Sequence, residues 1–120
     1  LLINEKKSAQ VIAVPVLKNM TDIEKRLYYL CASADINRLT TWDEYHFGGY
    51  AKKTNELISF MNQLYSAHQL PTDFVYTGKM MYAVMDQLQK GYFKKGNTIL
   101  CIHTGGLQGN LSLPPRTLVF

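Results

Sequence analysis

The sequence predicts an α/β fold in which apolar parallel strands alternate with helices. Two runs, Val11–Val16 and Ile99–Ile102, have the continuous apolar character of strands buried on both faces of a sheet. Between them, helical patterns begin near Thr21, Thr54 and Gly78. Because such strands joined by helices are typical of parallel sheets, we expect the two runs to be neighbouring or near-neighbouring parallel strands. The helices would cover them, as part of a three-layer domain.

The first elements have distinct local signals. Leu1–Lys7 resembles the last turns of a helix, and Gln10–Leu17 is the apolar, β-branched run of the first strand. Pro15 indicates that this strand stops near its end. Thr21 and Glu24 form a capping-box pattern that predicts the start of a helix. The apolar face of that helix would comprise Ile23, Leu27, Leu30, Cys31 and Ala34.

The middle of the chain is less regular until Thr54. Ile36–Phe47, with aromatic and acidic residues interleaved, fits either a short strand or an ordered loop. Gly48–Tyr50 then predicts a flexible joint that ends in an aromatic residue. A clear helix follows Thr54, and Pro71 closes the segment. The apolar stripe of that helix is Leu57, Ile58, Met61, Leu64 and Tyr65.

One more helix and the second strand complete the predicted fold. Thr77 is the expected N-cap of the helix, and Gly91 is its expected C-terminal glycine. Thr98–Ile102 follows as the second buried strand. The apolar positions that predict the helix are Met80, Met81, Val84 and Leu88.

Composition excludes several classes of protein. The chain has 120 residues, is 47% hydrophobic and carries a formal net charge of +4. Its lysines are spread along the chain, so a solvated surface is favoured over a nucleic-acid-binding stripe. No apolar run approaches the ~18 residues that a membrane-spanning helix needs. Cys31 and Cys101 have neither metal-ligand spacing nor a disulfide pattern, which favours a reduced, cytoplasmic protein.

Two apolar strands do not make a stable sheet by themselves. The chain also opens with Leu1 and lacks an initial methionine. We therefore expect a partial domain that leaves an apolar face exposed where further strands belong, and that covers this face by self-association. A stand-alone binding or interaction module without catalysis is the alternative.

Two polar stretches are candidates for a site. In open α/β sheets, ligands bind where loops leave the carboxyl ends of strands, which is where His103–Gly106 falls. Adjacent glycines there allow the backbone to approach a flat or anionic group, although an ordinary tight turn has the same signal. His103 alone favours a hydrogen-bonded core or loop histidine over a base. Tyr76 and Thr77 lie at a helix start, where backbone amides favour a polar ligand.

Three motifs in order carry a resemblance to a known family. FGGYAKKTNEL, DFVYTGKMM and ILCIHTGGLQGN resemble the C-terminal third of 1-aminocyclopropane-1-carboxylate deaminases and D-cysteine desulfhydrases. These are pyridoxal 5'-phosphate enzymes of the tryptophan-synthase-β fold type, fold type II. The resemblance covers essentially all 120 residues. It implies that residues 1–120 are a C-terminal segment of the large cofactor-binding domain, in a homodimeric lyase acting on a small amino acid.

The resemblance also implies roles for single residues. Tyr76 and Tyr50 match two tyrosines beside the substrate; Tyr76 is expected to act as acid–base catalyst, and Tyr50 to position the substrate. Thr77 would lie near the pyridine nitrogen of the cofactor, and Thr104 matches a threonine that hydrogen-bonds it. The ring edge would be lined by Gly105 and Gly106. Without the motifs, core or interface packing would explain the tyrosines, since the chain has eight.

The chain departs from the deaminase pattern at Thr77. Deaminases of the family have a glutamate there, whose charge keeps the pyridine nitrogen protonated and makes the ring a strong electron sink. A threonine does not supply that charge, so we expect α-proton abstraction with β-elimination instead of ring opening. By resemblance, the Schiff-base lysine and the phosphate loop lie upstream of this sequence, and Lys79 is not that lysine. The segment alone is therefore expected to be inactive.

Overall fold

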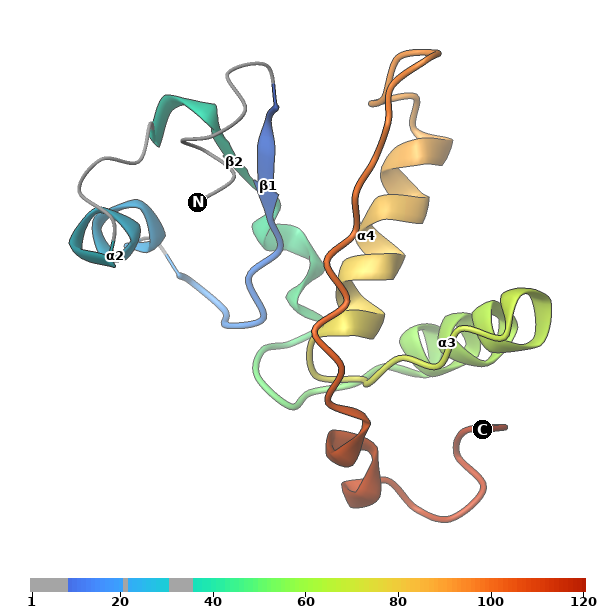
Figure 1. Ribbon diagram of the computed structural model, residues 1–120. Helices are drawn as coiled ribbons and strands as arrows, with labels where there is room; N and C mark the ends of the chain where they lie inside the picture. The colour runs from blue at the N-terminus through green and yellow to red at the C-terminus, as the bar shows by residue number, and fades with distance from the viewer. Residues whose placement is uncertain (1–8, 21, 31–35) are drawn as a thin grey trace.

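The computed structural model describes residues 9–20, 22–30 and 36–120, and it combines helices with a small parallel sheet (Figure 1). The expected helix Leu1–Lys7, the capping residue Thr21 and the face residues Cys31 and Ala34 lie outside the described residues. The elements in chain order are β1 (Val11–Ala13), α2 (Ile23–Leu30), β2 (Leu39–Thr41), α3 (Asn55–His68) and α4 (Thr77–Gln89), with 3₁₀ helices at Ile36–Arg38, Asp43–His46 and Leu107–Ser112.

The described sheet consists of β1 and β2, which run parallel with Val11 opposite Leu39. β1 confirms a strand within the predicted run Gln10–Leu17, but it is shorter than expected. β2 shows that part of the segment Ile36–Phe47 is a short strand and the rest is largely 3₁₀ helix. Parallel pairing across an intervening helix is compatible with the predicted α/β class.

The second predicted strand is wrong. Residues 98–102 have no strand ladder, and the Leu100 and Ile102 side chains are 75% and 55% exposed. The parallel partner of β1 is therefore β2 and not Ile99–Ile102. An apolar run forms a strand only where another strand satisfies its backbone groups. Ile102 is not paired with β1 but lines a groove together with Ile12 and Val14.

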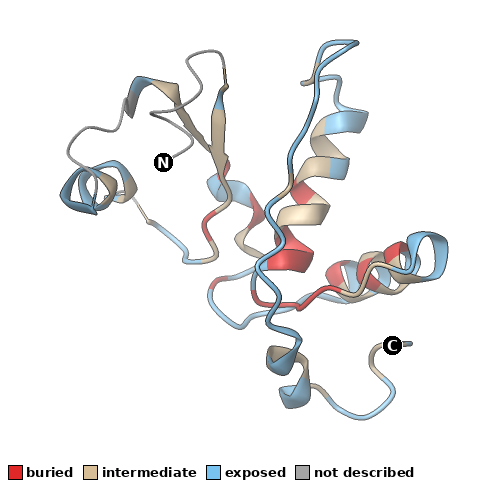
Figure 2. Cartoon of the chain, viewed as in Figure 1, coloured by how far each residue is buried: buried red, intermediate tan, exposed pale blue. Residues whose placement is uncertain are grey.

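The core lies where α3 meets α4 and the segment before it, as the buried residues in Figure 2 show. Leu57 and Met61 on α3 are fully buried against Phe74 and Val75, which confirms the predicted apolar stripe of this helix. A Cβ atom at Gly78 would lie 2.7 Å from the Asp73 carbonyl oxygen and 3.0 Å from the Met61 sulfur. Only glycine therefore allows α4 to begin this close to α3.

The predicted helix ends are partly confirmed. Thr54 is the N-cap of α3 and accepts a hydrogen bond from the Leu57 amide at 3.2 Å. Gly91 follows α4 with a φ of +73°, and the Tyr92 amide donates to the Gln87 carbonyl, as in a Schellman motif. Thr77, however, is the first residue of α4 and not its N-cap, a position that Tyr76 occupies.

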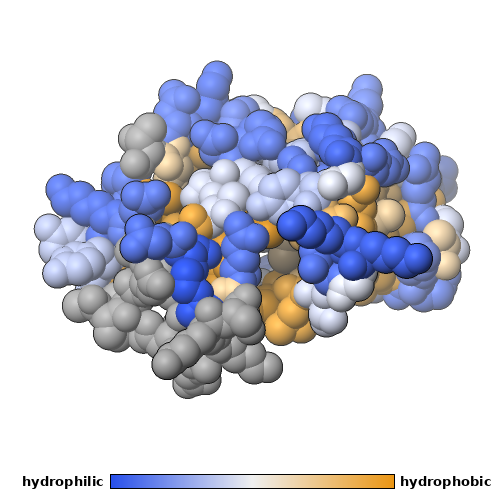
Figure 3. Space-filling view, turned by 90° about the horizontal axis from the view of Figure 1, so that it is seen from above, coloured by the Kyte–Doolittle hydropathy of each residue, from blue (hydrophilic) through white to orange (hydrophobic). Residues whose placement is uncertain are grey.

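Apolar side chains reach the surface in patches, as a view from above shows (Figure 3). The radius of gyration is 15.3 Å, whereas a compact domain of this length has about 13.6 Å. Of the predicted face of α2, Leu30 is 83% exposed, and no described residue of this helix is buried. Apolar side chains are thus exposed among the described residues, whereas an apolar face where further strands belong and its cover by self-association stay predictions.

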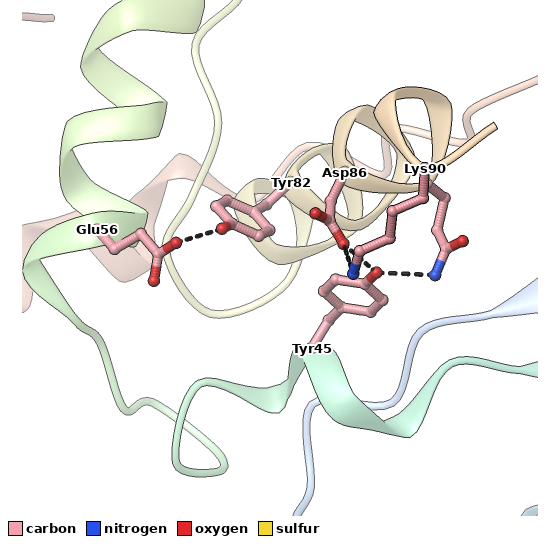
Figure 4. Close-up of polar contacts among 6 residues, drawn as sticks. Tyr45, Glu56, Tyr82, Asp86 and Lys90 are labelled. Carbon is pink, nitrogen blue, oxygen red and sulfur yellow. Dashed lines mark hydrogen bonds and ion pairs between the residues drawn. The ribbon is translucent and has the colours of Figure 1, made fainter. Parts of the chain in front are cut away.

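Phenol–carboxylate hydrogen bonds connect the aromatic residues around α4 (Figure 4). Tyr45 donates to Asp86, which also pairs with Lys90, and Tyr82 donates to Glu56 at the start of α3. The hydrogen bond to Glu56 raises the pKa of Tyr82 from 10.0 to about 12, with burial and the charge of Glu56 adding to it.

None of the helices described has the length and apolar character of a membrane-spanning segment.

We predict that Tyr82→Phe removes a stability loss at alkaline pH. A raised pKa means that the neutral phenol is favoured in the folded state, so its contribution is present below about pH 10 and is lost as the pH rises through about 12. Urea unfolding between pH 8 and pH 12 should show a shallower decline of unfolding free energy in Tyr82→Phe than in the parent. The control is Tyr65→Phe, a tyrosine whose ring lies against that of Phe120; equal slopes in parent and Tyr82→Phe would contradict the prediction.

Candidate functional site

The Asp73 carboxylate organises the start of α4. One of its oxygens accepts hydrogen bonds from the Val75 and Tyr76 amides at 2.8 and 2.9 Å. The other accepts from the Thr77 amide and the Thr77 hydroxyl, each at 2.8 Å. Asp73 is only 1% exposed, so these bonds replace its lost hydration and satisfy amides that a helix start leaves without partners. Sequence reasoning missed Asp73, although an aspartate just before a helix is a capping signal.

The Thr77 hydroxyl is fully engaged within the chain. It donates to Asp73 Oδ1 and accepts a hydrogen bond from the Asp73 amide at 2.9 Å. A hydroxyl has a single proton to donate. Because that proton is directed at Asp73, Thr77 has none left for a ligand nitrogen. Because the hydroxyl has partners for both hydrogen bonds, Thr77 can be buried, and it is 2% exposed.

Tyr50 and Tyr76 form a pair although they lie far apart in the sequence. Their hydroxyl oxygens are 3.4 Å apart, and their ring centroids lie 6.0 Å apart in an edge-on arrangement. Both side chains are about half exposed. The hydrogen bond with Tyr50 raises the pKa of Tyr76 above its usual value, and partial desolvation adds to this. Tyr76 therefore carries its phenolic proton at neutral pH.

A groove of about 170 Å³ lies beside Tyr76. Tyr76, Thr77 and Thr104 line it on the polar side, and the apolar wall consists of Ile12, Val14, Val16, Met80 and Ile102. Three of the predicted site residues therefore share one groove. Tyr50 does not line the groove, but it contacts Tyr76 beside it.

The His103–Gly106 loop is held against the segment before α4. His103 Nε2 lies 3.1 Å from the Pro71 carbonyl oxygen and Nδ1 accepts from the Gly105 amide at 3.2 Å, so the neutral Nε2–H tautomer satisfies both contacts. This is the arrangement of a structural loop histidine. Gly105 and Gly106 have φ values of +79° and +93°, which explains why glycine stands at both positions. Open space lies next to Gly105, where no described atom is within 4 Å of a Cβ position.

Asn110 joins the last motif to the second. Its side-chain oxygen accepts from the Phe74 amide at 3.1 Å, and its nitrogen donates to the Thr72 carbonyl at 2.9 Å. Both of its hydrogen-bonding functions thus hold the segment that leads into α4.

Among the described residues, no group of three His, Cys, Asp or Glu side chains could hold a metal ion.

Lys79 is fully buried in the first turns of α4. Its Nζ donates to the carbonyl oxygens of His46 and Gly49, both at 2.8 Å. Burial lowers the pKa of Lys79, and the charge of Asp73 opposes this effect. With its amine enclosed and bonded in this way, Lys79 does not reach the groove as a nucleophile. The sequence marks this lysine only as part of the GK dipeptide and does not reveal its burial.

Comparison with known proteins finds relatives of this chain. A Pyrococcus abyssi protein provisionally named 1-aminocyclopropane-1-carboxylate deaminase is 34% identical over 93 residues, which is 78% of this chain and 27% of the relative. D-cysteine desulfhydrase of Klebsiella pneumoniae is 38% identical over 87 residues, 72% of this chain and 26% of the relative. The resemblance to the 1-aminocyclopropane-1-carboxylate deaminase and D-cysteine desulfhydrase family is confirmed.

The chain spans about a quarter of the length of these family relatives. A Pyrococcus horikoshii protein, also provisionally named 1-aminocyclopropane-1-carboxylate deaminase, is 39% identical over 75 residues, 62% of this chain and 22% of that protein. No family model matches the chain, and no solved structure matches it significantly. The names of the relatives indicate an enzyme family.

We predict that Thr77→Val destabilises the protein by about 1–3 kcal/mol, the usual cost of leaving buried hydrogen-bonding groups without partners. The change keeps the shape of the side chain but leaves the Asp73 amide unpaired and removes one donor from the carboxylate. Thr77→Ser, which keeps the hydroxyl, is the matched control and should lose under about 1 kcal/mol. Urea unfolding measures both. Equal losses in the two variants would mean that the hydroxyl contributes nothing to this cap.

Proposed function

We propose that this chain forms part of one wall of the active site of a pyridoxal-phosphate-dependent lyase that acts on a small amino acid. The main support is that Tyr76, Thr77 and Thr104, singled out by the family motifs, line one groove with Tyr50 beside it. The names of the relatives, deaminase and D-cysteine desulfhydrase, support the reaction class. The remaining expectations, a homo-oligomer and a cytoplasmic location, stay predictions.

The groove suits one edge of a flat aromatic ring. Its apolar wall includes Val14, Met80 and Ile102, and Thr104 is an exposed hydroxyl residue that lines it, next in the chain to the open space at Gly105. We assign the hydrogen bond to the pyridine nitrogen to Thr104, because the Thr77 proton is donated to Asp73. Pyridoxal phosphate, when bound, supplies an electron sink that stabilises negative charge on the substrate α-carbon.

Tyr76 is the proposed acid–base residue. Its pKa is raised by the hydrogen bond that it donates to Tyr50, so it holds its proton at neutral pH. Unlike the buried 2.8 Å bond from Thr77 to Asp73, this bond is 3.4 Å long and exposed, so the Tyr76 proton can be turned to a leaving group or a substrate nitrogen. Its exposed fraction of 50% leaves the hydroxyl accessible to a ligand in the groove. Tyr50, in contact with the same hydroxyl, is proposed to orient the substrate and to maintain the position of Tyr76.

We propose β-elimination over ring opening as the reaction. A threonine hydroxyl at the ring nitrogen is neutral, so it does not hold the ring protonated as a carboxylate does. No carboxylate lines the groove among the described residues. Such a ring withdraws electrons less strongly, which suits the loss of a good leaving group, such as a thiolate, from the β-carbon of D-cysteine.

The test for Tyr76 is Tyr76→Phe in the complete gene product. We expect the absorption spectrum of the bound cofactor to be nearly unchanged, while sulfide release from D-cysteine falls by about 10²–10⁴-fold, the usual worth of general acid–base catalysis. The matched control is Tyr92→Phe, a tyrosine beside Trp42. If Tyr76→Phe retains near-normal turnover of every substrate that the parent accepts, the catalytic assignment is wrong.

The test for Thr104 separates binding from catalysis. We expect Thr104→Ala to weaken cofactor binding or to shift the absorption of the bound cofactor, because the ring nitrogen loses its hydrogen-bond donor. Thr104→Ser keeps the hydroxyl and should resemble the parent in both measurements. Should Thr104→Ala leave affinity and spectrum unchanged, the ring nitrogen is bound elsewhere.

A further inference from the structure

The most unusual side chain outside the proposed chemistry is Lys79, because a lysine is almost never fully buried unless its charge has partners. Its exposed fraction is 0%, and its Nζ donates to the carbonyl oxygens of His46 and Gly49 at 2.8 Å each. The amine therefore joins the first turns of α4 to a loop that lies some thirty residues earlier in the chain.

Hydrogen bonds inside that loop also define its shape: the Gly48 amide donates to His46 Nδ1 at 2.8 Å, and the Lys52 amide donates to the Gly49 carbonyl at 3.2 Å. Phe47, Gly48 and Gly49 have φ values of +51°, +94° and +121°, which place three consecutive residues in the left-handed region. The Gly49 amide donates to the His46 carbonyl at 3.0 Å, so the turn directs both acceptor carbonyls toward Lys79. Tyr50 follows directly, and its side chain is 54% exposed. The carbonyl next to Tyr50 is thus held by the lysine at 2.8 Å, with the Lys52 amide as a longer second donor.

The partner tyrosine is fixed from the same place. The Tyr76 amide donates to the Asp73 carboxylate at 2.9 Å, and Asp73 also attracts the charge of Lys79. Tyr76 is therefore held through its own amide by Asp73, and Tyr50 through the carbonyl of the preceding residue by Lys79, both of which are buried groups at or just before the start of α4. The hydroxyl contact of 3.4 Å between Tyr50 and Tyr76 joins two segments that have these separate supports.

We propose that Lys79 is a positioning residue that holds Tyr50 against Tyr76 through the Gly49 carbonyl. The effect of Lys79 on the position of the tyrosine pair depends only on these hydrogen bonds, whereas its effect on catalysis rests on the proposed function. In this role Lys79 does not line the groove, and it acts only through the carbonyl oxygens of the loop.

The first experiment measures the pair without any activity. 3-Fluorotyrosine is placed at position 50 of the complete gene product, and its ¹⁹F resonance is compared with that of a Tyr76→Ala reference, in which the pair is absent. In Lys79→Met the resonance should move at least halfway toward this reference. Lys94→Met removes the charge of an exposed lysine in a distant turn and should leave the resonance unchanged. An unchanged resonance in folded Lys79→Met would overturn the proposal.

Folding is controlled by a second variant. Lys79→Gln keeps two amide protons on a shorter side chain, so it should retain part of the parent resonance and should fold at least as well as Lys79→Met. Thermal unfolding and circular dichroism are recorded for each. Loss of the fold in both variants would also overturn the proposal, because Lys79 would then support the whole domain and not the tyrosine pair specifically.

The second experiment connects the pair to turnover of D-cysteine. Lys79→Met should lower kcat/KM about 10–100-fold, and combining it with Tyr50→Phe should be no worse than the more damaged single variant, within about twofold, because both act through Tyr50. Fully multiplicative effects would overturn the proposal. If the parent neither binds pyridoxal phosphate nor releases sulfide, the proposed function fails, whereas the fluorine measurement still decides the role of Lys79.

Discussion

The hydrogen bonds of the Asp73 carboxylate are the interaction on which the rest of this structure depends. Four donors from Val75, Tyr76 and Thr77 surround it, so the start of α4 has one conformation. A buried carboxylate is stable only with such a full set of donors. Fixing this turn also fixes Gly78 against Met61, where α4 begins close to α3. The core and the candidate site are therefore set by the same few residues.

All three motifs of the family resemblance meet at this turn. Lys79 connects it to the glycine loop before Tyr50, and Asn110 and His103 connect it to the loop that carries Thr104. These connections are hydrogen bonds to backbone carbonyl oxygens and amides, so they fix the positions of the backbone segments, which apolar side-chain packing alone would not do. Such constraints suit a site, because a hydroxyl presented by a fixed backbone needs little reorganisation when a ligand binds.

The sequence predicts the helices well because their signals are local. The apolar stripe around Leu57 and the threonine cap at Thr54 suffice for α3. The strand expected at Ile99–Ile102 is wrong because an apolar run predicts burial but does not say which strand would supply its backbone hydrogen bonds. The capping role given to Thr77 belongs mainly to Asp73, since a hydroxyl and a carboxylate four residues apart both suit a helix start. The burial of Lys79 has no local signature.

The difference between Thr77 and Thr104 bears on what chemistry this chain favours. Both are threonines that line one groove, but the Thr77 proton is committed to Asp73 while Thr104 is exposed. Replacing Thr77 by a glutamate would also place a second carboxylate beside Asp73, and two close negative charges in a buried position repel each other strongly. The Asp73 cap and a carboxylate at position 77 are thus hard to combine in this turn. The way α4 begins therefore supports the proposal of a neutral donor at the ring nitrogen, and with it the proposal of elimination in preference to ring opening.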